Sequence, residues 1–273
     1  MNFTKPKDLE ELLQIIDKKQ QGKRYLLAGG TDINVQIKHG MIKNADIIYI
    51  NGIDELKGIK KENGNIIIGA LTTFDDIINA KLPFLSEVLM NFASPIIQTI
   101  ATIGGNIANA SPTNDVSPPL LVLDASLVLA SATGQRVVPL KDFYQGYKVM
   151  DLKENEIIHS VILPEADLSN CSTLYQKVGA RKTLTIAKAA IAGIKQITDG
   201  KFTTIKLAVG SLNEYPRRLH LCEQYLKGLA IADIDYAKLK DTLQTEITPI
   251  SDLRSDEDYR FAVCWNLIEG FVG

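Results

Sequence analysis

The chain has 273 residues, which is long enough for one large domain or for two ordinary ones. Its 30 Lys and Arg side chains against 32 Asp and Glu leave a net charge of -2, which gives no electrostatic reason to bind nucleic acid or an anionic membrane. Because the sequence has neither an apolar run of about 20 residues nor a signal-peptide pattern, we expect a cytoplasmic protein with small-molecule or protein partners.

The first fifty residues predict alternating helices and strands. Apolar side chains recur at helical spacing between Leu9 and Ile16, and Asp8 precedes them as a candidate N-cap. Two apolar runs follow at residues 25–27 and 46–50, with a glycine-rich turn after the first run. These runs are typical of short strands.

The next hundred residues are rich in β-branched side chains. Segments of this kind, bounded by Gly, Pro or Asn, predict strands at residues 65–70, 126–131, 136–140 and 157–164. Apolar residues at helical spacing across 82–92 predict a helix between the first two strands. We therefore predict an α+β domain that covers residues 1–164.

A polar break then separates a second, smaller α+β domain, residues 172–273. Apolar runs at 172–178 and 189–197 predict strands, and Asp199-Gly200 is a favourable two-residue hairpin turn into a third strand. Apolar periodicity predicts helices in the tail, including one that contains Phe261, Trp265 and Ile268. We interpret this part as a β-meander with helices.

Cysteines and histidines give no sign of a metal centre. The three cysteines are far apart and odd in number, which disfavours a disulfide framework, a zinc site or a four-cysteine iron–sulfur cluster. The three histidines lack a Cys or carboxylate at useful spacing. These residues are Cys171, Cys222, Cys264, His39, His159 and His220. We expect no metal ligands, and the acidic pair Asp75-Asp76 is interpreted as the start of a helix.

Two Gly-Gly segments are the candidates for ligand binding, AGGTDIN at 28–34 and TIGGNIANASPTND at 102–115. Adjacent glycines permit positive φ and leave backbone N–H groups uncovered, so such a turn can form a concave nest for a pyrophosphate. Neighbouring polar side chains could add hydrogen bonds to phosphate, ribose or ring edges. These side chains are Thr31, Asp32, Thr102, Asn106, Ser111 and Asp115.

Structural alternatives exist for these segments. A Gly-Gly turn can simply be a sharp connection, Asp32 can fix its own turn through the backbone, and Asn106 can stabilise loop geometry. Neither segment matches the dinucleotide fingerprint G-x-G-x-x-G or the P-loop, which disfavours a Rossmann fold or an NTPase.

The amino-acid sequences and the spacing of these segments resemble those of a known family. LLAGGTDINVQIK at 26–38 and TIGGNIANASPTNDVSPPLLVLDASL at 102–127 resemble the paired FAD-binding motifs of the flavoprotein (medium) subunits of molybdenum hydroxylases, the xanthine dehydrogenase and carbon monoxide dehydrogenase family. Four further segments are similar to family segments in the same order. They are FYQGYKV at 143–149, ENEIIHSVILP at 154–164, YQKVGARKTLTIAKA at 175–189 and ISDLRSDEDYR at 250–260.

The resemblance implies a two-lobed FAD-binding domain of the vanillyl-alcohol oxidase (PCMH) type and a smaller C-terminal domain of the CO dehydrogenase flavoprotein type. It also implies that backbone amides of both glycine segments hold the pyrophosphate, that Asp115 lies near the adenosine end, and that Lys177 lies near the isoalloxazine. The implied cofactor-binding residues are Leu26, Leu27, Ala28, Gly29, Gly30, Thr31, Asp32, Ile33, Thr102, Ile103, Gly104, Gly105, Asn106, Asp115, Ile158 and Lys177.

Two of these residues have other interpretations. Lys177, together with Arg181 and Lys182, can form a solvated basic edge, and Ile158 can be ordinary strand core. No cysteine precedes Cys171, so the resemblance implies FAD alone as the cofactor, without the iron–sulfur cluster that some relatives carry in this subunit.

The implied function is electron transfer without a catalytic side chain. Electrons would pass from a [2Fe-2S] small subunit, supplied by a molybdopterin-binding large subunit, through FAD to an acceptor such as NAD. Two alternatives remain open at this point. One is a flavin-binding assembly or regulatory module without redox turnover, and the other is a stand-alone flavin oxidoreductase.

Overall fold

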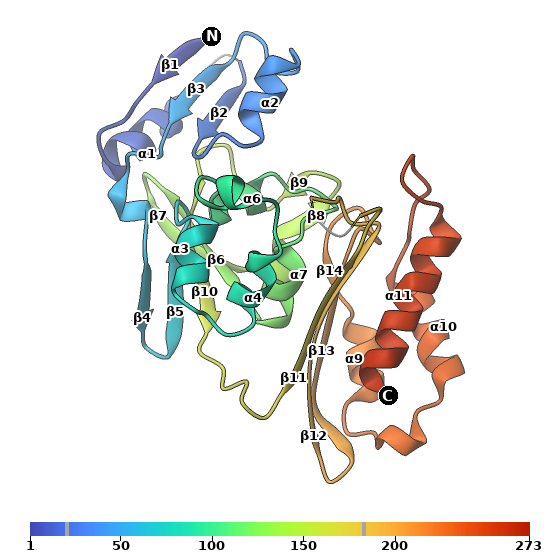
Figure 1. Cartoon of the computed structure of the whole chain (residues 1–273). Coiled ribbons are helices and arrows are strands. Elements are labelled where there is room, and N and C mark those ends of the chain that lie inside the picture. The colour runs from blue at the N-terminus through green and yellow to red at the C-terminus, as the bar shows by residue number, and fades with distance from the viewer. Residues whose placement is uncertain (20–21, 182–183) are drawn as a thin grey trace.

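The computed structural model describes residues 1–19, 22–181 and 184–273. Three groups of strands, each with its own helices, follow one another along the chain (Figure 1). The first two groups form the two lobes of the N-terminal part, and the third forms the C-terminal part. This arrangement confirms the predicted α+β class.

The first lobe is a three-stranded parallel sheet in the order β1-β3-β2, at the top of Figure 1. Helix α1 begins after Asp8, as predicted, because the Asp8 carboxylate accepts the backbone N–H of Glu11 at 2.9 Å. Leu12 and Ile16 of this helix share a buried cluster with Ile48 of the sheet. The elements are β1 (Asn2–Thr4), α1 (Leu9–Asp17), β2 (Arg24–Leu27), α2 (Ile33–Lys38), β3 (Asp46–Tyr49) and η1 (Asp54–Leu56).

The second lobe is a five-stranded antiparallel sheet in the order β4-β5-β10-β6-β7. Its strands are β4 (Ile59–Glu62), β5 (Asn65–Gly69), β6 (Ser126–Ser131), β7 (Gly134–Pro139) and β10 (Ile157–Pro164). Its helices are α3 (Phe74–Asn79), α4 (Leu85–Met90), α5 (Pro95–Gln98), α6 (Ile103–Ala108), α7 (Ser117–Val122) and α8 (Leu140–Phe143). A short ribbon of β8 (Tyr144–Gly146) and β9 (Val149–Met150) completes it.

Local rules explain some of these boundaries. A capping box between Thr73 and Asp76 starts α3, which confirms the helix-start interpretation of the acidic pair. The helix predicted across 82–92 is shorter than expected, because Phe84 has a φ of +63° and α4 begins only after it. The apolar side chains of this segment nevertheless point into the core, and they include Leu85 and Leu89.

The C-terminal part is an antiparallel sheet in the order β11-β12-β13-β14, with helices on its outer face (Figure 1). Asp199 and Gly200 form the predicted hairpin turn with φ values of +52° and +74°. The elements are β11 (Ser172–Val178), β12 (Ala189–Thr198), β13 (Lys201–Gly210), β14 (Arg217–Arg218), α9 (His220–Leu226), η2 (Ile231–Asp233), α10 (Tyr236–Glu246) and α11 (Glu257–Val272). The predicted tail helix is α11.

Strand β12 is apolar on both faces because both faces are covered. Ile191 belongs to the core beneath the outer helices, whereas Ala192 and Ile194 belong to the core that fills the second lobe. The sheet of the C-terminal part therefore packs directly against the N-terminal part.

Ion pairs reinforce this contact beyond the end of α7. Arg218 of β14 donates to the carbonyl of Leu121 at 2.9 Å and to the carboxylate of Asp124 at 2.6 Å. Lys206 of β13 donates to the same carboxylate. Although partial burial raises the pKa of Asp124, the hydrogen bonds from Lys206 and Arg218 lower it below its ordinary value.

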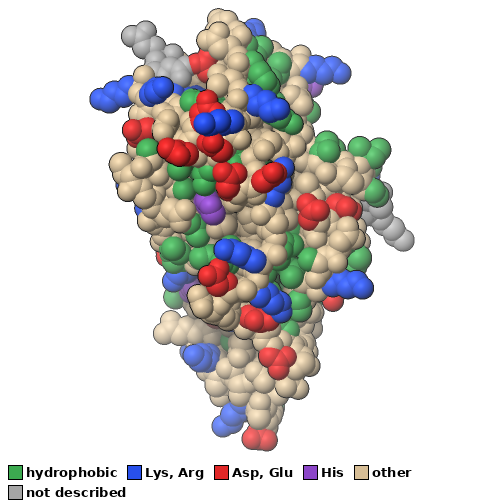
Figure 2. Space-filling view, turned by 90° about the vertical axis from the view of Figure 1, so that its left-hand side faces the viewer, with side chains coloured by type: hydrophobic (Ala, Val, Ile, Leu, Met, Phe, Trp, Pro, Cys, Tyr) green, Lys and Arg blue, Asp and Glu red, His purple; other side chains and the backbone are tan. Residues whose placement is uncertain are grey.

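Charges of both signs are interspersed on the face that carries α1 and β4, as Figure 2 shows. This pattern agrees with the small net charge of the chain. Within the residues that the structure describes, no helix has the length and apolar character needed to cross a bilayer.

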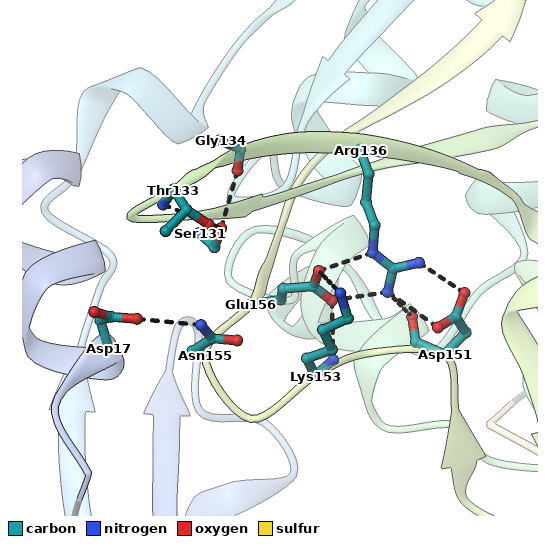
Figure 3. Close-up of polar contacts among 9 residues, drawn as sticks. All are labelled: Asp17, Ser131, Thr133, Gly134, Arg136, Asp151, Lys153, Asn155 and Glu156. Atoms are coloured by element: carbon teal, nitrogen blue, oxygen red, sulfur yellow. Dashed lines mark hydrogen bonds and ion pairs between the residues drawn. The ribbon is translucent and has the colours of Figure 1, made fainter.

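A polar network holds the connection between β9 and β10 (Figure 3). The guanidinium of Arg136 on β7 donates two hydrogen bonds of 2.8 Å to Glu156 and binds Asp151 at 2.8 and 3.0 Å. Beside it, Asn155 donates to Asp17 at the end of α1, 3.1 Å away. The network therefore ties this connection both to β7 and to the first lobe.

The Arg136→Met variant tests this network. The hydrogen bonds from Arg136 lower the pKa values of Glu156 and Asp151, so their stabilising effect is present at neutral pH and is lost as the pH falls through those lowered values. We expect a melting temperature about 3–6 °C below wild type at pH 7, with the gap closing below about pH 4. Thermal unfolding followed by circular dichroism across this pH range measures the effect.

Lys60→Met is the matched control, because the Lys60–Glu62 pair is exposed and such pairs contribute little. Equal melting temperatures for Arg136→Met and Lys60→Met at pH 7 would contradict the structural role of the network.

Candidate functional site

The first glycine segment connects β2 to α2, and it includes a glycine that has no room for a side chain. Gly30 has a φ of +73°, which favours glycine. A Cβ atom on Gly29 would lie 1.7 Å from the carbonyl oxygen of Ile100, which precedes the second glycine segment by two residues. The two segments are about seventy residues apart in sequence, and the structure places the first one against the residues that immediately precede the second.

The backbone N–H groups of this first segment are available to a ligand. Within the described part of the chain, the N–H groups of residues 29–33 donate no hydrogen bond. Consecutive unpaired N–H groups in a turn that contains a residue of positive φ suit an anion such as a pyrophosphate. The first segment therefore has the local backbone geometry that a pyrophosphate site would require.

The second glycine segment differs from the prediction. Residues 103–108 form helix α6 instead of an open turn, and Thr102 is its N-cap. The N–H groups of Ile103 and Gly104 donate to carbonyls that lie immediately after β5, at 3.1 and 2.9 Å. The N–H of Gly105 donates to the Thr102 hydroxyl at 3.2 Å. The expectation of uncovered amides is therefore wrong for these three residues.

Close packing explains the glycine at the start of this helix. A Cβ atom on Gly104 would lie 2.6 Å from the Cβ of Ala70, so only glycine lets α6 approach the end of β5. The sequence shows a Gly-Gly pair in both segments, but the reason for the pair differs. Both pairs contain a glycine that permits a close contact, but only the first pair also has a glycine with positive φ and leaves backbone N–H groups free.

The side chains of Asp32 and Asn106 do not stabilise their own turns, contrary to the structural alternatives for these residues. The Asp32 carboxylate accepts a hydrogen bond from the Gln36 side chain and makes no cap with its own turn. The Oδ1 atom of Asn106 is buried and has no hydrogen-bond partner. An unpaired buried acceptor is costly in a folded protein, so this atom is available to a ligand donor.

The structure pairs Asp115 with Lys177 across the two parts of the chain. Asp115 lies in the loop before α7, Lys177 lies on β11, and their Oδ2 and Nζ atoms are 2.7 Å apart. Both side chains are only 13% exposed. Burial raises the pKa of Asp115 above its ordinary value, and the attraction of Lys177 only partly offsets this effect.

This pair bears on two sequence-based expectations. The resemblance implied that Asp115 lies near the adenosine end of the cofactor and Lys177 near the isoalloxazine; the two side chains are in direct contact, and their places along the cofactor stay predictions. Lys177 is also not part of a solvated basic edge, because its side chain is largely buried. Arg181 instead binds the carbonyl of Leu184, and Lys182 lies outside the described residues.

Tyr175 is a site residue that the sequence analysis missed. It lies two positions before Lys177 on β11, so both side chains are on the same face of the strand. Its hydroxyl is buried beside the carboxylate of Asp115. Burial, and then the charge of Asp115 and a side-chain hydrogen bond with it, raise the pKa of Tyr175 well above its ordinary value. Alternation on a predicted strand was the signal that could have found it.

Ile158 packs mainly as core. It is 7% exposed and shares the second-lobe core with Val161 and Leu163. A register shift in β10 between Ile158 and Ser160 brings these side chains to one face. The structure thus supports the alternative interpretation of Ile158 as strand core.

The comparisons with known proteins agree with this fold. A family model described as the FAD binding domain in molybdopterin dehydrogenase matches residues 1–166, and the CO dehydrogenase flavoprotein C-terminal domain matches residues 175–273. The chain therefore belongs to the family of FAD-binding subunits of molybdenum hydroxylases. It is an oxidoreductase component whose cofactor is FAD.

Individual relatives match over most of their length. The xanthine dehydrogenase FAD-binding subunit of Escherichia coli O157:H7 is 30% identical, over 86% of this chain and 82% of that protein. The carbon monoxide dehydrogenase medium chain of Hydrogenophaga pseudoflava is 30% identical, over 89% and 86%. A solved structure of carbon monoxide dehydrogenase from the same organism has a TM-score of 0.91 at 28% identity, covering 99% of this chain and 95% of that chain.

The Gly29→Ala variant tests the contact between the first glycine segment and Ile100. The added Cβ atom would lie 1.7 Å from the Ile100 carbonyl oxygen, so the backbone that carries the free N–H groups must move. We expect at least a tenfold loss of FAD affinity, measured by quenching of flavin fluorescence.

Gly270→Ala is the matched control, because a Cβ atom on Gly270 of α11 meets nothing within 4 Å. This control is expected to stabilise the helix by about 0.5–1 kcal/mol and to leave FAD affinity unchanged. Wild-type affinity in Gly29→Ala would show that the first segment is not part of the FAD site.

Proposed function

We propose that this chain is the electron-transfer subunit of a molybdenum hydroxylase complex. In this proposal, electrons from the iron–sulfur clusters of a partner subunit reach the FAD held by this chain and leave it for an acceptor such as NAD. Its two folding units are residues 1–164 and 172–273, and the FAD site includes residues of both. FAD supplies the capacity to accept and release electrons, which no protein side chain here offers.

The observation that carries the proposal is the run of unpaired N–H groups at residues 29–33, held against the residues that immediately precede the second glycine segment. These groups would bind the pyrophosphate, and Gly29 keeps side-chain atoms out of the contact. The fixed backbone orients the N–H groups before the ligand arrives, which lowers the entropy cost of binding.

Lys177 has a separate role in this proposal. It is a buried cation held 2.7 Å from Asp115, so the protein fixes its position in a region of low water access. A positive charge near the ring of reduced flavin would stabilise the negative charge that reduction produces there. The residue would thereby tune the cofactor without transferring a proton.

The proposed partners are a molybdopterin-binding large subunit and a [2Fe-2S] small subunit. Support comes from relatives described as the medium chains of carbon monoxide dehydrogenases and as the FAD-subunit of nicotinate dehydrogenase, names that denote one subunit of a larger enzyme. The substrate of the complex would be selected in the large subunit.

The experiment that tests the proposal uses the purified chain and the complex captured through a tag on it. We expect one FAD per chain, bleaching of its visible absorbance on anaerobic dithionite addition, and molybdenum and iron in the captured complex. FAD without metals or partner subunits would favour a stand-alone flavin oxidoreductase. Partner subunits with a chain that binds no FAD would favour the assembly module.

A further inference from the structure

Arg260 is the largest of the fully buried side chains in the described part of the chain. It lies in the first turn of α11, is 2% exposed, and donates to the carbonyls of Lys188 and Ser211 at 2.6 and 3.1 Å. Its other terminal nitrogen donates to the Asp252 carboxylate at 2.8 Å. Lys188 precedes β12 and Ser211 follows β13, so one guanidinium joins α11 to the adjacent ends of two strands.

Stability alone does not account for this buried arginine. Removing a guanidinium and a carboxylate from water offsets much of their attraction, so a buried ion pair adds little net stability. Among the described residues, the buried Nε atom of Arg260 also has no hydrogen-bond partner, which adds a further cost. What a planar group with several donors does provide is a fixed position for the groups that it binds.

Ser211 is the bound group that connects Arg260 to the rest of the molecule. Its φ of +65° is unfavourable for serine and persists only where the surrounding contacts hold it. Arg260 holds its carbonyl, and its N–H donates to the carbonyl of Pro112 at 2.9 Å. A Cβ atom on the neighbouring Gly210 would lie 3.2 Å from Pro118 Cγ. The loop before α7 therefore rests on the end of β13 that Arg260 holds.

We infer that Arg260 is a positioning residue for FAD binding, which acts through Ser211 on the loop before α7. This loop ends the second glycine segment and carries Asp115, one of the predicted cofactor-binding residues. The inference rests on the proposed function, because it takes this loop as part of the FAD site. A loop that is already held in place loses less conformational entropy when a ligand binds, and the affinity is higher for that reason.

The Arg260→Met variant removes all three hydrogen bonds and keeps a side chain that fills part of the space. We expect the full chain to bind FAD about five- to twentyfold more weakly in isothermal titration calorimetry, because the loop must then be ordered at the moment of binding. In the FAD-free chain we also expect faster hydrogen–deuterium exchange in peptides that cover residues 110–117. A general loss of stability would not confine faster exchange to this loop.

Two control variants separate positioning from stability. Arg254→Met removes an exposed arginine that binds the same Asp252 carboxylate at 3.1 Å, and it is expected to leave both measurements unchanged. Ile234→Val removes a methyl group from the core near the opposite end of β13, so it lowers the melting temperature without reaching Ser211. Equal losses of FAD affinity in Ile234→Val and Arg260→Met would reduce the effect to stability and overturn the inference.

Asp252→Asn is a milder second variant, because it keeps the acceptor atom and removes the charge that holds the guanidinium. We expect smaller changes in the same direction in both measurements. Wild-type FAD affinity in a folded Arg260→Met, or weaker affinity without faster exchange in the loop, overturns the inference and leaves the proposed function intact. If Arg260→Met does not fold, the same results in Asp252→Asn overturn it. A wild-type chain that binds no FAD overturns both the inference and the proposed function.

Discussion

Helix α7 is buried along its whole length, and both parts of the chain pack around it. Its position fixes the Asp115–Lys177 pair before its first turn and the Asp124–Arg218 pair after its last. Because closely packed interiors leave little freedom for sliding, the sheet of the C-terminal part cannot shift without breaking these contacts. The relative placement of Asp115 and Lys177 therefore depends on this one buried helix.

The two ion pairs differ in burial, and for this reason the pKa values of their carboxylates shift in opposite directions. The Asp124 carboxylate has two cationic partners, and its pKa is lowered. Asp115 has one cationic partner in a more buried place, and its pKa is raised. A carboxylate with a raised pKa opposes folding once the pH rises through the value of the unfolded chain, so Asp115 is a poor choice for stability alone. The ligand-binding role proposed for Asp115 would account for such a costly group at this position.

Local sequence patterns were sufficient for much of the fold. The helix after Asp8, the hairpin at Asp199-Gly200 and the strands at 65–70 and 126–131 follow from capping, turn chemistry and β-branched runs. The short helices α6 and α7 were not predicted, because the first turn of α6 bonds to the residues after β5 and α7 has no side-chain cap. Helices of one or two turns leave little periodicity to read in the sequence.

The candidate site was predicted only in part, and for a physical reason. The first glycine segment carries its own signal, since positive φ and free N–H groups are local properties. The contact between Gly29 and Ile100, the Asp115–Lys177 pair and the burial of Tyr175 join residues that are distant in sequence. Composition and motif spacing do not show which distant residues come together. The family resemblance implied which residues bind the cofactor, but not how they lie relative to one another.

Hydrogen–deuterium exchange of the full chain, with and without saturating FAD, tests the central claim most directly, namely that residues 29–33 and the Asp115–Tyr175–Lys177 cluster form one site for FAD. The account predicts slower exchange in peptides that cover residues 27–34, because their unpaired N–H groups would gain phosphate acceptors, and in peptides from the start of α7 and from β11. Protection confined to one of these regions, or found only elsewhere in the chain, would contradict a single site shared between the two parts.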